Sequence, residues 1–423
     1  MEKNIRDDKN ILLDKNFLLY FMGMLVTQVG NVIYSFGISW YILELTGSAV
    51  QGGSYLAFTG ILTLILSNFG AAIVDRMDKV KIMYVTDFIR GILILGASII
   101  IMNTSDQGLI LLTLYVSGFI LVTFGSLFGP ATQALIKYMV PEHKLQQANS
   151  YLGIKNQLQS IFGMAIAGFI YAILGVVGIF IINGVSFILS GVTELFIKVD
   201  SKEEVKTEMT FKQICADIVE GWKYIYSKRV IFRMMLISVF LNFPFALLFG
   251  IGLPYLFNVT LGLEAYYMSN VQVVMSIAMI VMMIFLSNMT QPEKYYNNLR
   301  KYMILTSFFF LIAIGVVALM NMQVYPFIYT YIAFLVSMAL MGMANAGLNV
   351  PMQTFFVKAF DKEMFARSTA VIGIMSSVSY PIAAFSGGLI IDNFGLSYVI
   401  ILSVVIFVIC IGWFLAEKGI KEI

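Results

Sequence analysis

Charged side chains are scarce in this sequence. Asp, Glu, Lys and Arg make up only 12% of its 423 residues, whereas 59% are hydrophobic. A soluble domain of this size carries far more charge, so the composition excludes an ordinary soluble protein and indicates a membrane protein. Histidine occurs once, at His143, and cysteine twice, at Cys215 and Cys410. These counts exclude a multi-histidine metal centre and a disulfide framework, and we expect neither a metal nor another cofactor.

The sequence signatures of catalysis and of nucleic-acid binding are missing as well. The chain contains no Gly-Lys-Ser/Thr phosphate-binding loop, and its single histidine offers no base for a serine or cysteine nucleophile. The net charge is only +3, and the basic residues are dispersed rather than gathered into one patch. We therefore expect no enzyme, no ATP-driven pump and no nucleic-acid partner.

Long apolar segments recur along the whole chain. Each is long enough to cross a bilayer, which takes about 20 residues. No alternating β-barrel pattern accompanies them, so we expect helices, which satisfy their backbone hydrogen bonds internally in lipid. Twelve spans are predicted, at residues 16–42, 50–74, 83–103, 108–129, 149–173, 178–197, 232–256, 267–289, 302–320, 326–348, 367–391 and 395–416. The sequence thus predicts an all-α membrane protein whose immediate partner is the lipid bilayer.

The basic residues give the orientation of these spans. If the N-terminus is cytoplasmic, all 27 Lys and Arg residues fall in inner segments, and the outer loops contain only the acids Glu44, Asp106, Glu264 and Asp392. Lys and Arg concentrate in the cytoplasmic loops of membrane proteins. We therefore expect a multi-pass protein of the cell membrane with both termini in the cytoplasm.

The longest polar interval, residues 198–230, divides the spans into two sets of six. Five apolar residues recur in it at helical spacing: Phe211, Ile214, Ile218, Trp222 and Ile225. This spacing predicts an amphipathic helix at the inner membrane surface. We accordingly predict a six-helix bundle in residues 1–197, a cytoplasmic linker in 198–230 and a second six-helix bundle in 231–423.

Two short echoes relate these halves. The segment that begins at Pro130 parallels the one that begins at Pro351, and we expect both in loops after the fourth and tenth spans. Further on, two pairs of glycines correspond at nearly the same offset: Gly168 with Gly388, and Gly175 with Gly395. Parallel repeats of six helices predict two pseudo-symmetric bundles with a cavity between them.

A charged hairpin connects the second and third predicted spans. Asp75 and Arg76 lie at a helix end, where their charges can hold neighbouring helix termini together and separate again when the helices move. Lys79 follows in the same hairpin. Asp87 and Arg90 lie one to two turns inside the third span, spaced i, i+3 on one face, where they can pair. We predict that these five residues form a gating charge latch between helix ends.

The run Asp75-Arg76-x-x-Lys79-x-Lys81 resembles the loop between helices 2 and 3 of the major facilitator superfamily, G-x-x-x-D-R-x-x-R-K, with Ala71 in place of the motif glycine. Segments 30–49, 128–152 and 217–225 resemble the branch of that superfamily that contains the macrolide efflux pumps and enterobactin exporters. The resemblance covers nearly the whole chain. It implies the two-bundle major facilitator fold, alternating-access export that is often coupled to inward proton flow, and a cytoplasmic latch at Asp75 and Arg76.

Polar residues in otherwise apolar spans are candidates for the wall of the central cavity. Gln28, Asn31 and Ser35 share one face of the first span at i, i+3, i+7. The second half contributes Asn242, Gln272, Asn345 and Asn349. Each of these side chains could bind substrate, or it could instead join neighbouring helices through hydrogen bonds of about 0.6–2 kcal/mol.

Lys155 is the second kind of candidate, an ionisable group inside a span. It lies about two turns into the fifth span, with Gln159 one turn further along the same face. Charges are costly inside a bilayer, which makes such a residue a functional candidate. Lys155 could contact an anionic group of a substrate, or it could be an anchor that snorkels to the inner surface; the sequence leaves both readings open.

Together these features predict a secondary active transporter that exports amphipathic small molecules, drug-like, antibiotic-like or siderophore-like, by alternating access. Proton antiport is left open, because no carboxylate lies at mid-membrane depth and the antiporter motif G-P-x-x-G-G is replaced by Gly163-Met-Ala-Ile-Ala-Gly168. Two alternatives are a proton-independent lipid or lysolipid facilitator and a membrane receptor or scaffold without transport. We expect a monomer.

Overall fold

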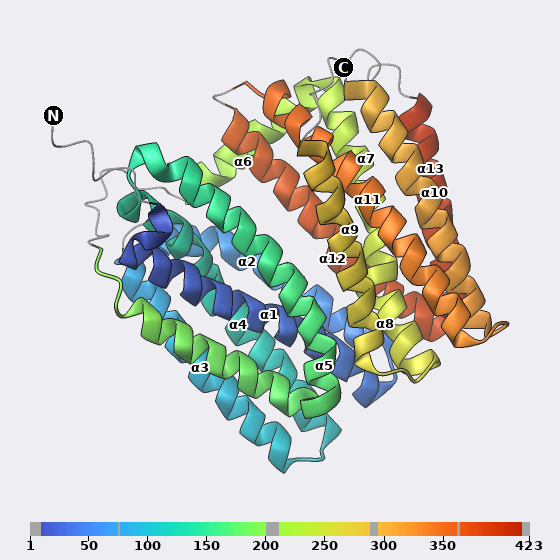
Figure 1. The fold of residues 1–423 in the computed structure, drawn as a ribbon, viewed down its shortest axis with the longest axis horizontal. Coiled ribbons are helices and arrows are strands. Elements are labelled where there is room, and N and C mark those ends of the chain that lie inside the picture. The colour runs from blue at the N-terminus through green and yellow to red at the C-terminus, as the bar shows by residue number, and fades with distance from the viewer. Residues whose placement is uncertain (1–9, 75–76, 200–210, 288–294, 362–363, 417–423) are drawn as a thin grey trace. The chain divides into compact units, whose positions relative to one another are not determined.

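The computed structural model describes residues 10–74, 77–199, 211–287, 295–361 and 364–416, and the regular structure of these residues is entirely helical (Figure 1). In these ranges, eleven helices are long and apolar enough to cross a membrane. One of them, α5 (Leu145–Glu194), contains two spans that meet at Gly175, where the backbone leaves the helical conformation. The predicted all-α fold with twelve spans is therefore confirmed.

By packing, the chain divides into two compact units, Met1–Ile38 with Leu62–Phe211, and Ser39–Ile61 with Lys212–Ile423. The first unit contains parts of α1 (Lys15–Thr46) and α2 (Ala49–Val74) and all of α3 (Lys79–Asn103), α4 (Gln107–Met139) and α5. Within it, α3 packs against both α4 and α5. The remaining parts of α1 and α2 pack with the second half of the sequence.

The second unit contains the later helices: α6 (Phe211–Ser227), α7 (Arg229–Phe245), α8 (Leu253–Tyr255), α9 (Ala265–Ser287), α10 (Tyr295–Met322), α11 (Phe327–Ala359), α12 (Phe365–Phe394) and α13 (Leu396–Ala416). Two π-helical segments, Ala246–Gly252 and Leu256–Thr260, flank α8, so that Arg229–Thr260 forms one continuous span. Pro244 and Pro254 lie in this span, and each removes a backbone donor from the regular helical pattern. Such π turns widen a helix locally and are frequent at functional sites.

Glycines bring α1 close to the second half of α5. Gly23, Gly30 and Gly37 are spaced by seven residues and face α5. A Cβ atom on Gly23 would lie 2.7 Å from Thr193 Oγ1, and one on Gly37 would lie 2.8 Å from Ile179 Cγ1. Small residues allow such backbone approach between helices in lipid, where packing replaces the hydrophobic effect as the driving force.

The segment Ser39–Ile61 is joined to α12 by one carboxylate. Asp392 accepts hydrogen bonds from Ser48 Oγ at 2.5 Å, from the Ala49 amide at 2.8 Å and from the Val50 amide at 3.1 Å. It therefore satisfies donors at the N-terminus of α2 that the helix itself leaves unpaired. Further along the same contact, a Cβ atom on Gly53 would overlap the backbone of Ala384.

The expected loop positions of Pro130 and Pro351 are wrong. Both prolines lie inside helices, because α4 continues to Met139 and α11 continues to Ala359. Proline is tolerated within membrane helices where neighbouring groups satisfy the freed carbonyl, so it does not mark a helix end there. The glycine echo does mark equivalent turns: Gly175 and Gly395 have φ values of 61° and 92°, in the left-handed region that favours glycine.

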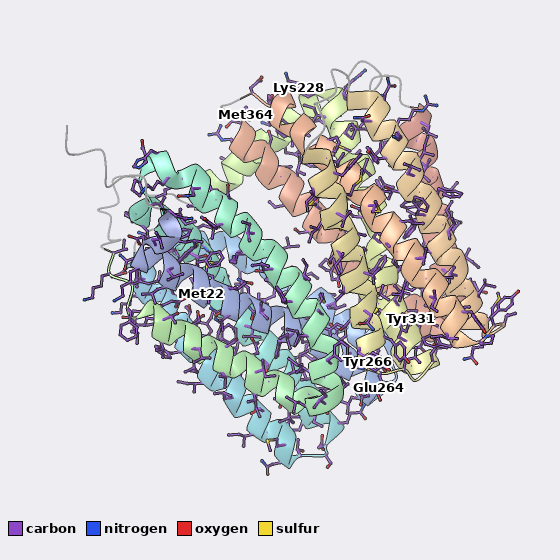
Figure 2. The ribbon with its side chains drawn as sticks, in the orientation of Figure 1. Met22, Lys228, Glu264, Tyr266, Tyr331 and Met364 are labelled. Atoms are coloured by element: carbon purple, nitrogen blue, oxygen red, sulfur yellow. The ribbon has the colours of Figure 1, made fainter. Side chains whose placement is uncertain are left out.

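The predicted amphipathic segment forms α6, which contacts α12 and the residue Asp361 within the second unit. Arg367 Nη1 lies 2.8 Å from Glu220 Oε2, and Tyr224 donates a hydrogen bond to Asp361 Oδ2 at 2.9 Å. Figure 2 shows Lys228 and Met364 at one end of this unit and Glu264, with Tyr266 and Tyr331, at the opposite end. Lys228 and Glu264 thus lie at opposite ends of this unit.

Candidate functional site

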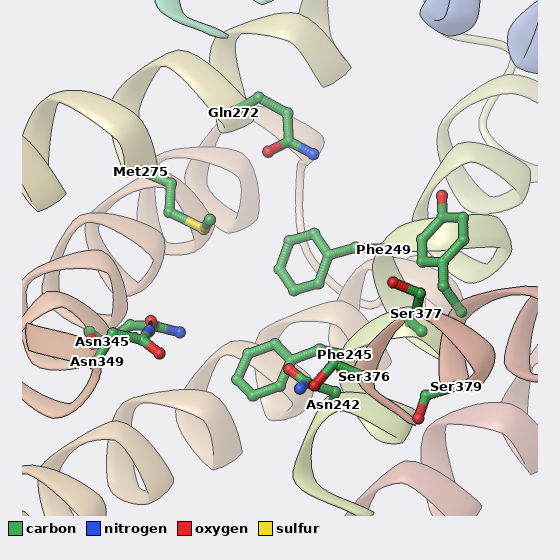
Figure 3. Close-up of a pocket in the computed structure, with 12 residues that line it drawn as sticks. Asn242, Phe245, Phe249, Gln272, Met275, Asn345, Asn349, Ser376, Ser377 and Ser379 are labelled. Atoms are coloured by element: carbon green, nitrogen blue, oxygen red, sulfur yellow. Dashed lines mark hydrogen bonds between the residues drawn. The ribbon is translucent and has the colours of Figure 1, made fainter. Parts of the chain in front are cut away.

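A pocket of about 480 Å³ opens in the second unit (Figure 3). Four parts of the fold build it: α7 with the π-helical segment that follows, α9, α11 and α12. Its lining comprises Asn242, Phe245, Ala246, Phe249, Gln272, Met275, Asn345, Asn349, Ser376, Ser377, Ser379 and Tyr380. This volume lies in the range of pockets that take drug-sized ligands.

The pocket gathers the four second-half amides that the sequence singles out. Asn242, Gln272, Asn345 and Asn349 come from three different helices, yet all line this one cavity. Asn349 Nδ2 donates to the Asn345 carbonyl at 3.1 Å and also contacts Asn345 Oδ1, so these two side chains form one polar group (Figure 3). Each amide offers both donors and an acceptor. The arrangement can therefore match several patterns of uncharged polar groups on a ligand.

Aromatic rings supply the apolar part of the wall. Phe245 stacks on Phe249 with ring centroids 6.2 Å apart, and it is held from behind by Phe310 at 4.5 Å and Phe407 at 5.7 Å. Tyr380 lies at the rim with 44% of its surface exposed. The sequence did not single out Phe249 or the three lining serines, although the closely spaced Ser376, Ser377 and Ser379 just before a proline are a usable signal.

No Asp, Glu, Lys, Arg or His is among the described residues that line the pocket. A smaller cavity of about 80 Å³ adjoins it, shares Asn242, Phe245, Asn345 and Asn349, and extends towards Met303 and Phe414. It too is lined by amides, hydroxyls and apolar groups only. This lining can form hydrogen bonds to neutral groups of a ligand, and its rings and methyl groups can contact the apolar part of the ligand.

The first unit has the opposite character, because it buries charges. Asp87 and Arg90 form the ion pair that their spacing predicts, with 0% and 3% of their surfaces exposed. The Arg90 guanidinium lies between two rings, 4.5 Å from the centroid of Phe128 and 4.4 Å from that of Phe187, which is favourable cation–π geometry. Thr27 on α1 donates to Asp87 Oδ2 at 3.4 Å.

Glu194, which the sequence analysis missed, lies in the same cluster. It is the last residue of α5, it is fully buried, and its Oε1 accepts a hydrogen bond from Ser190 Oγ at 3.2 Å. Asp87 and Arg90 are the charges that act on it. An acid inside a predicted span, 178–197, was the available signal in the sequence.

The other predicted latch residues differ in what can be said of them. Asp75 and Arg76 lie outside the described residues. Lys79 is 2% exposed, and its Nζ lies 5.4 Å from the centroid of the Tyr138 ring. That these residues gate transport stays a prediction.

Lys155 is 5% exposed, and in the described parts of the chain it forms no ion pair. One turn further along α5, Gln159 Oε1 is buried and accepts no hydrogen bond. A snorkelling anchor keeps its ammonium in water, so this burial favours a contact inside the bundle. Of the α1 residues, Gln28 and Asn31 are half-buried and Ser35 is exposed, and all three lie in the first unit, outside the pocket described above.

Comparison with known proteins adds the family. A model of the Major Facilitator Superfamily matches residues 20–335 and 296–422. Macrolide efflux protein A of Streptococcus pyogenes is 21% identical over 406 residues, 94% of each chain. The multidrug efflux pump Tap of Mycolicibacterium fortuitum is 22% identical over 229 residues, 52% of this chain and 55% of Tap.

Other relatives match over less of their length. The uncharacterized MFS-type transporter YkuC of Bacillus subtilis (strain 168) is 25% identical over 186 residues, 43% of this chain and only 41% of YkuC. The chain thus spans less than half of that relative. Among solved structures, an inward-facing bacterial homologue of the iron transporter ferroportin superposes with a TM-score of 0.74 at 14% identity, over 95% of this chain and 98% of the other. At that identity the likeness shows the fold alone.

Proposed function

This chain belongs to the Major Facilitator Superfamily, and from that premise we propose that it exports neutral amphipathic small molecules, drug-like or siderophore-like, across the cell membrane. The observation that carries the proposal is the pocket of the second unit, where four amides and three serines face two phenylalanine rings and a tyrosine. A ligand with an apolar body and a few uncharged polar groups fits this lining.

Two relatives support the direction of transport. Macrolide efflux protein A and the pump Tap are named for efflux, and the first aligns over 94% of both chains. Export by a membrane transporter of this superfamily needs no enzymatic step. We further propose that both termini lie in the cytoplasm, because every Lys and Arg then lies on the inner side. We also propose that the protein is a monomer.

The test is accumulation of Nile red, an uncharged amphipathic dye, and of erythromycin in bacterial cells that do or do not express the protein. Expression should lower the accumulation of at least one of them, and Asn242→Ala should reverse the effect. Asn321→Ala is the matched control, since Asn321 is a half-buried amide whose Nδ2 donates to Ser397 Oγ outside the pocket. Equal accumulation with and without the protein for both compounds, extended to a panel of lysolipids, would refute export and leave a receptor or scaffold role.

A further inference from the structure

The charged residues that are buried in the first unit do not line the proposed substrate pocket. Asp87 and Glu194 are 0% exposed and Arg90 is 3% exposed, and they come from α3 and α5, which pack against each other. Two carboxylates and one guanidinium leave a net charge of −1 when all three are ionised. An uncompensated charge inside a protein is costly, and two neighbouring carboxylates disfavour each other's ionised form.

The contacts show which acid lacks compensation. Arg90 is paired directly with Asp87, whose second oxygen also receives the Thr27 hydroxyl. Among the described residues, Glu194 receives only the Ser190 hydroxyl on Oε1, and none of them donates a hydrogen bond to its buried Oε2. A fully buried carboxylate oxygen that accepts no hydrogen bond is the natural position for a proton.

Within the part of the chain that the structure describes, Asp87 and Arg90 are the charged groups that act on Glu194. On α1, Tyr20 is buried nearby, but its hydroxyl donates to the Thr132 carbonyl at 3.1 Å. On α3, the Lys79 ammonium lies 5.4 Å from the centroid of the Tyr138 ring. The other groups around the cluster do not titrate in the physiological range: Thr27, Ser190, Phe128 and Phe187.

We propose that Asp87, Arg90 and Glu194 form a buried proton-binding site in which Glu194 takes up and releases one proton while Asp87 neutralises Arg90. Uptake adds one proton to a Glu194 carboxylate oxygen and brings the cluster from −1 to zero. Glu194 is the last residue of α5, so the site lies at an end of this helix and not in its middle.

The site is in contact with a helix that carries substrate candidates. Gly23 of α1 packs against Ser190 and Thr193, and Thr27 of α1 bonds Asp87. The residue after Thr27 is Gln28, the first of the three polar residues on the neighbouring face of α1. A change of charge at Glu194 therefore acts directly on the packing of α1. This coupling rests on the proposed export function, whereas proton binding itself does not.

Infrared difference spectroscopy of the full chain in lipid vesicles tests the proton directly. Acidification of the wild type should produce the C=O stretching band of a protonated carboxyl group, and Glu194→Gln should lose it. Glu220→Gln removes an exposed carboxylate paired with Arg367 and should keep the band. Glu194→Asp should keep the band with a shifted midpoint, which separates titration from misfolding. A band that persists unchanged in Glu194→Gln, or that is absent from the wild type, overturns the proposal.

Export of Nile red from the same vesicles under an imposed pH gradient tests the coupling. The wild type should respond to the gradient, and Glu194→Gln should lose this response while it still exchanges dye at equilibrium. Wild-type export that ignores the gradient overturns the coupling role. If the wild type moves neither Nile red nor erythromycin, yet the infrared band disappears in Glu194→Gln, the proposed function fails and the proton site stands.

Discussion

The two units place their polar groups in opposite ways. The first unit buries ionisable residues: Asp87, Arg90 and Glu194 are enclosed between α1, α3, α4 and α5. A cavity of about 540 Å³ between α1 and α5 has an almost entirely apolar lining that includes none of the three. The second unit opens a cavity of about 480 Å³ and lines it with amides, hydroxyls and rings but no charge. In the two proposals made above, the cargo binds in the second unit and the proton binds in the first, so the two roles fall to chemically different sites.

The two units should also differ in how substitutions affect them. Buried charges depend on each other, because removal of one leaves its partner unpaired. Substitution of an amide in an open pocket removes a hydrogen bond that water can replace. Substitutions should therefore damage stability in the first unit and affinity in the second.

Loss of Arg90 should have the largest effect. Arg90→Leu leaves two buried carboxylates without a cation, and breaking a buried pair in this way costs about 3–5 kcal/mol. Thermal unfolding of the purified protein in detergent measures the loss. The matched control is Arg367→Leu, which breaks an ion pair whose two side chains are 37% and 56% exposed, and which should cost about 0–1 kcal/mol. Similar losses for the two variants would contradict the comparison.

The second largest effect should come from a larger side chain at a closely packed glycine. Gly30→Leu drives a side chain into Ser186 and Asn183 of α5, and overpacking of this kind costs about 1–3 kcal/mol. Ser377→Leu adds similar volume at an exposed position in the wall of the pocket. It should leave the unfolding temperature near that of the wild type and reduce export instead. A larger loss of stability in Ser377→Leu than in Gly30→Leu would contradict the expected difference between the α1–α5 contact and the wall of the pocket.

Removal of one amide from the pocket should weaken binding moderately. Asn345→Ala deletes the partner of Asn349 and one hydrogen-bonding group towards the ligand, worth about 0.5–1.5 kcal/mol, which is roughly a two- to tenfold rise in the apparent Michaelis constant. The concentration dependence of Nile red export measures it, with unchanged thermal unfolding as the companion observation. A large loss of stability without a change in affinity would assign Asn345 to helix packing.

The smallest effect on neutral substrates should come from Lys155. Lys155→Gln removes a buried cation of the first unit that has no described ion-pair partner. We expect a raised apparent Michaelis constant for anionic amphiphiles, because the lost charge can no longer attract them, and little change for Nile red. Competition between the two classes of compound in the export assay measures the selectivity. An equal effect on both classes would make Lys155 a structural residue.

The sequence predicts most of the fold, since long apolar runs specify spanning helices almost independently of their neighbours. It also identifies Asn242, Gln272, Asn345 and Asn349, because an amide is conspicuous in an apolar helix. Phe249 could not be found this way, because 35 phenylalanines occur in the chain and one that faces a cavity looks like any other. The contact between Ser39–Ile61 and α12 is tertiary packing, and no local pattern encodes it.

The carboxylate of Asp392 binds the N-terminus of α2 through hydrogen bonds that can break and re-form. Asp392 is exposed, and its bonds to Ser48 Oγ and to the Val50 amide are exposed as well, whereas the bond to the Ala49 amide is partly buried. Each bond contributes about 0.5–1.5 kcal/mol. Thermal motion can therefore break and re-form the bonds one at a time, so this contact holds the start of α2 against α12 without locking the two helices together.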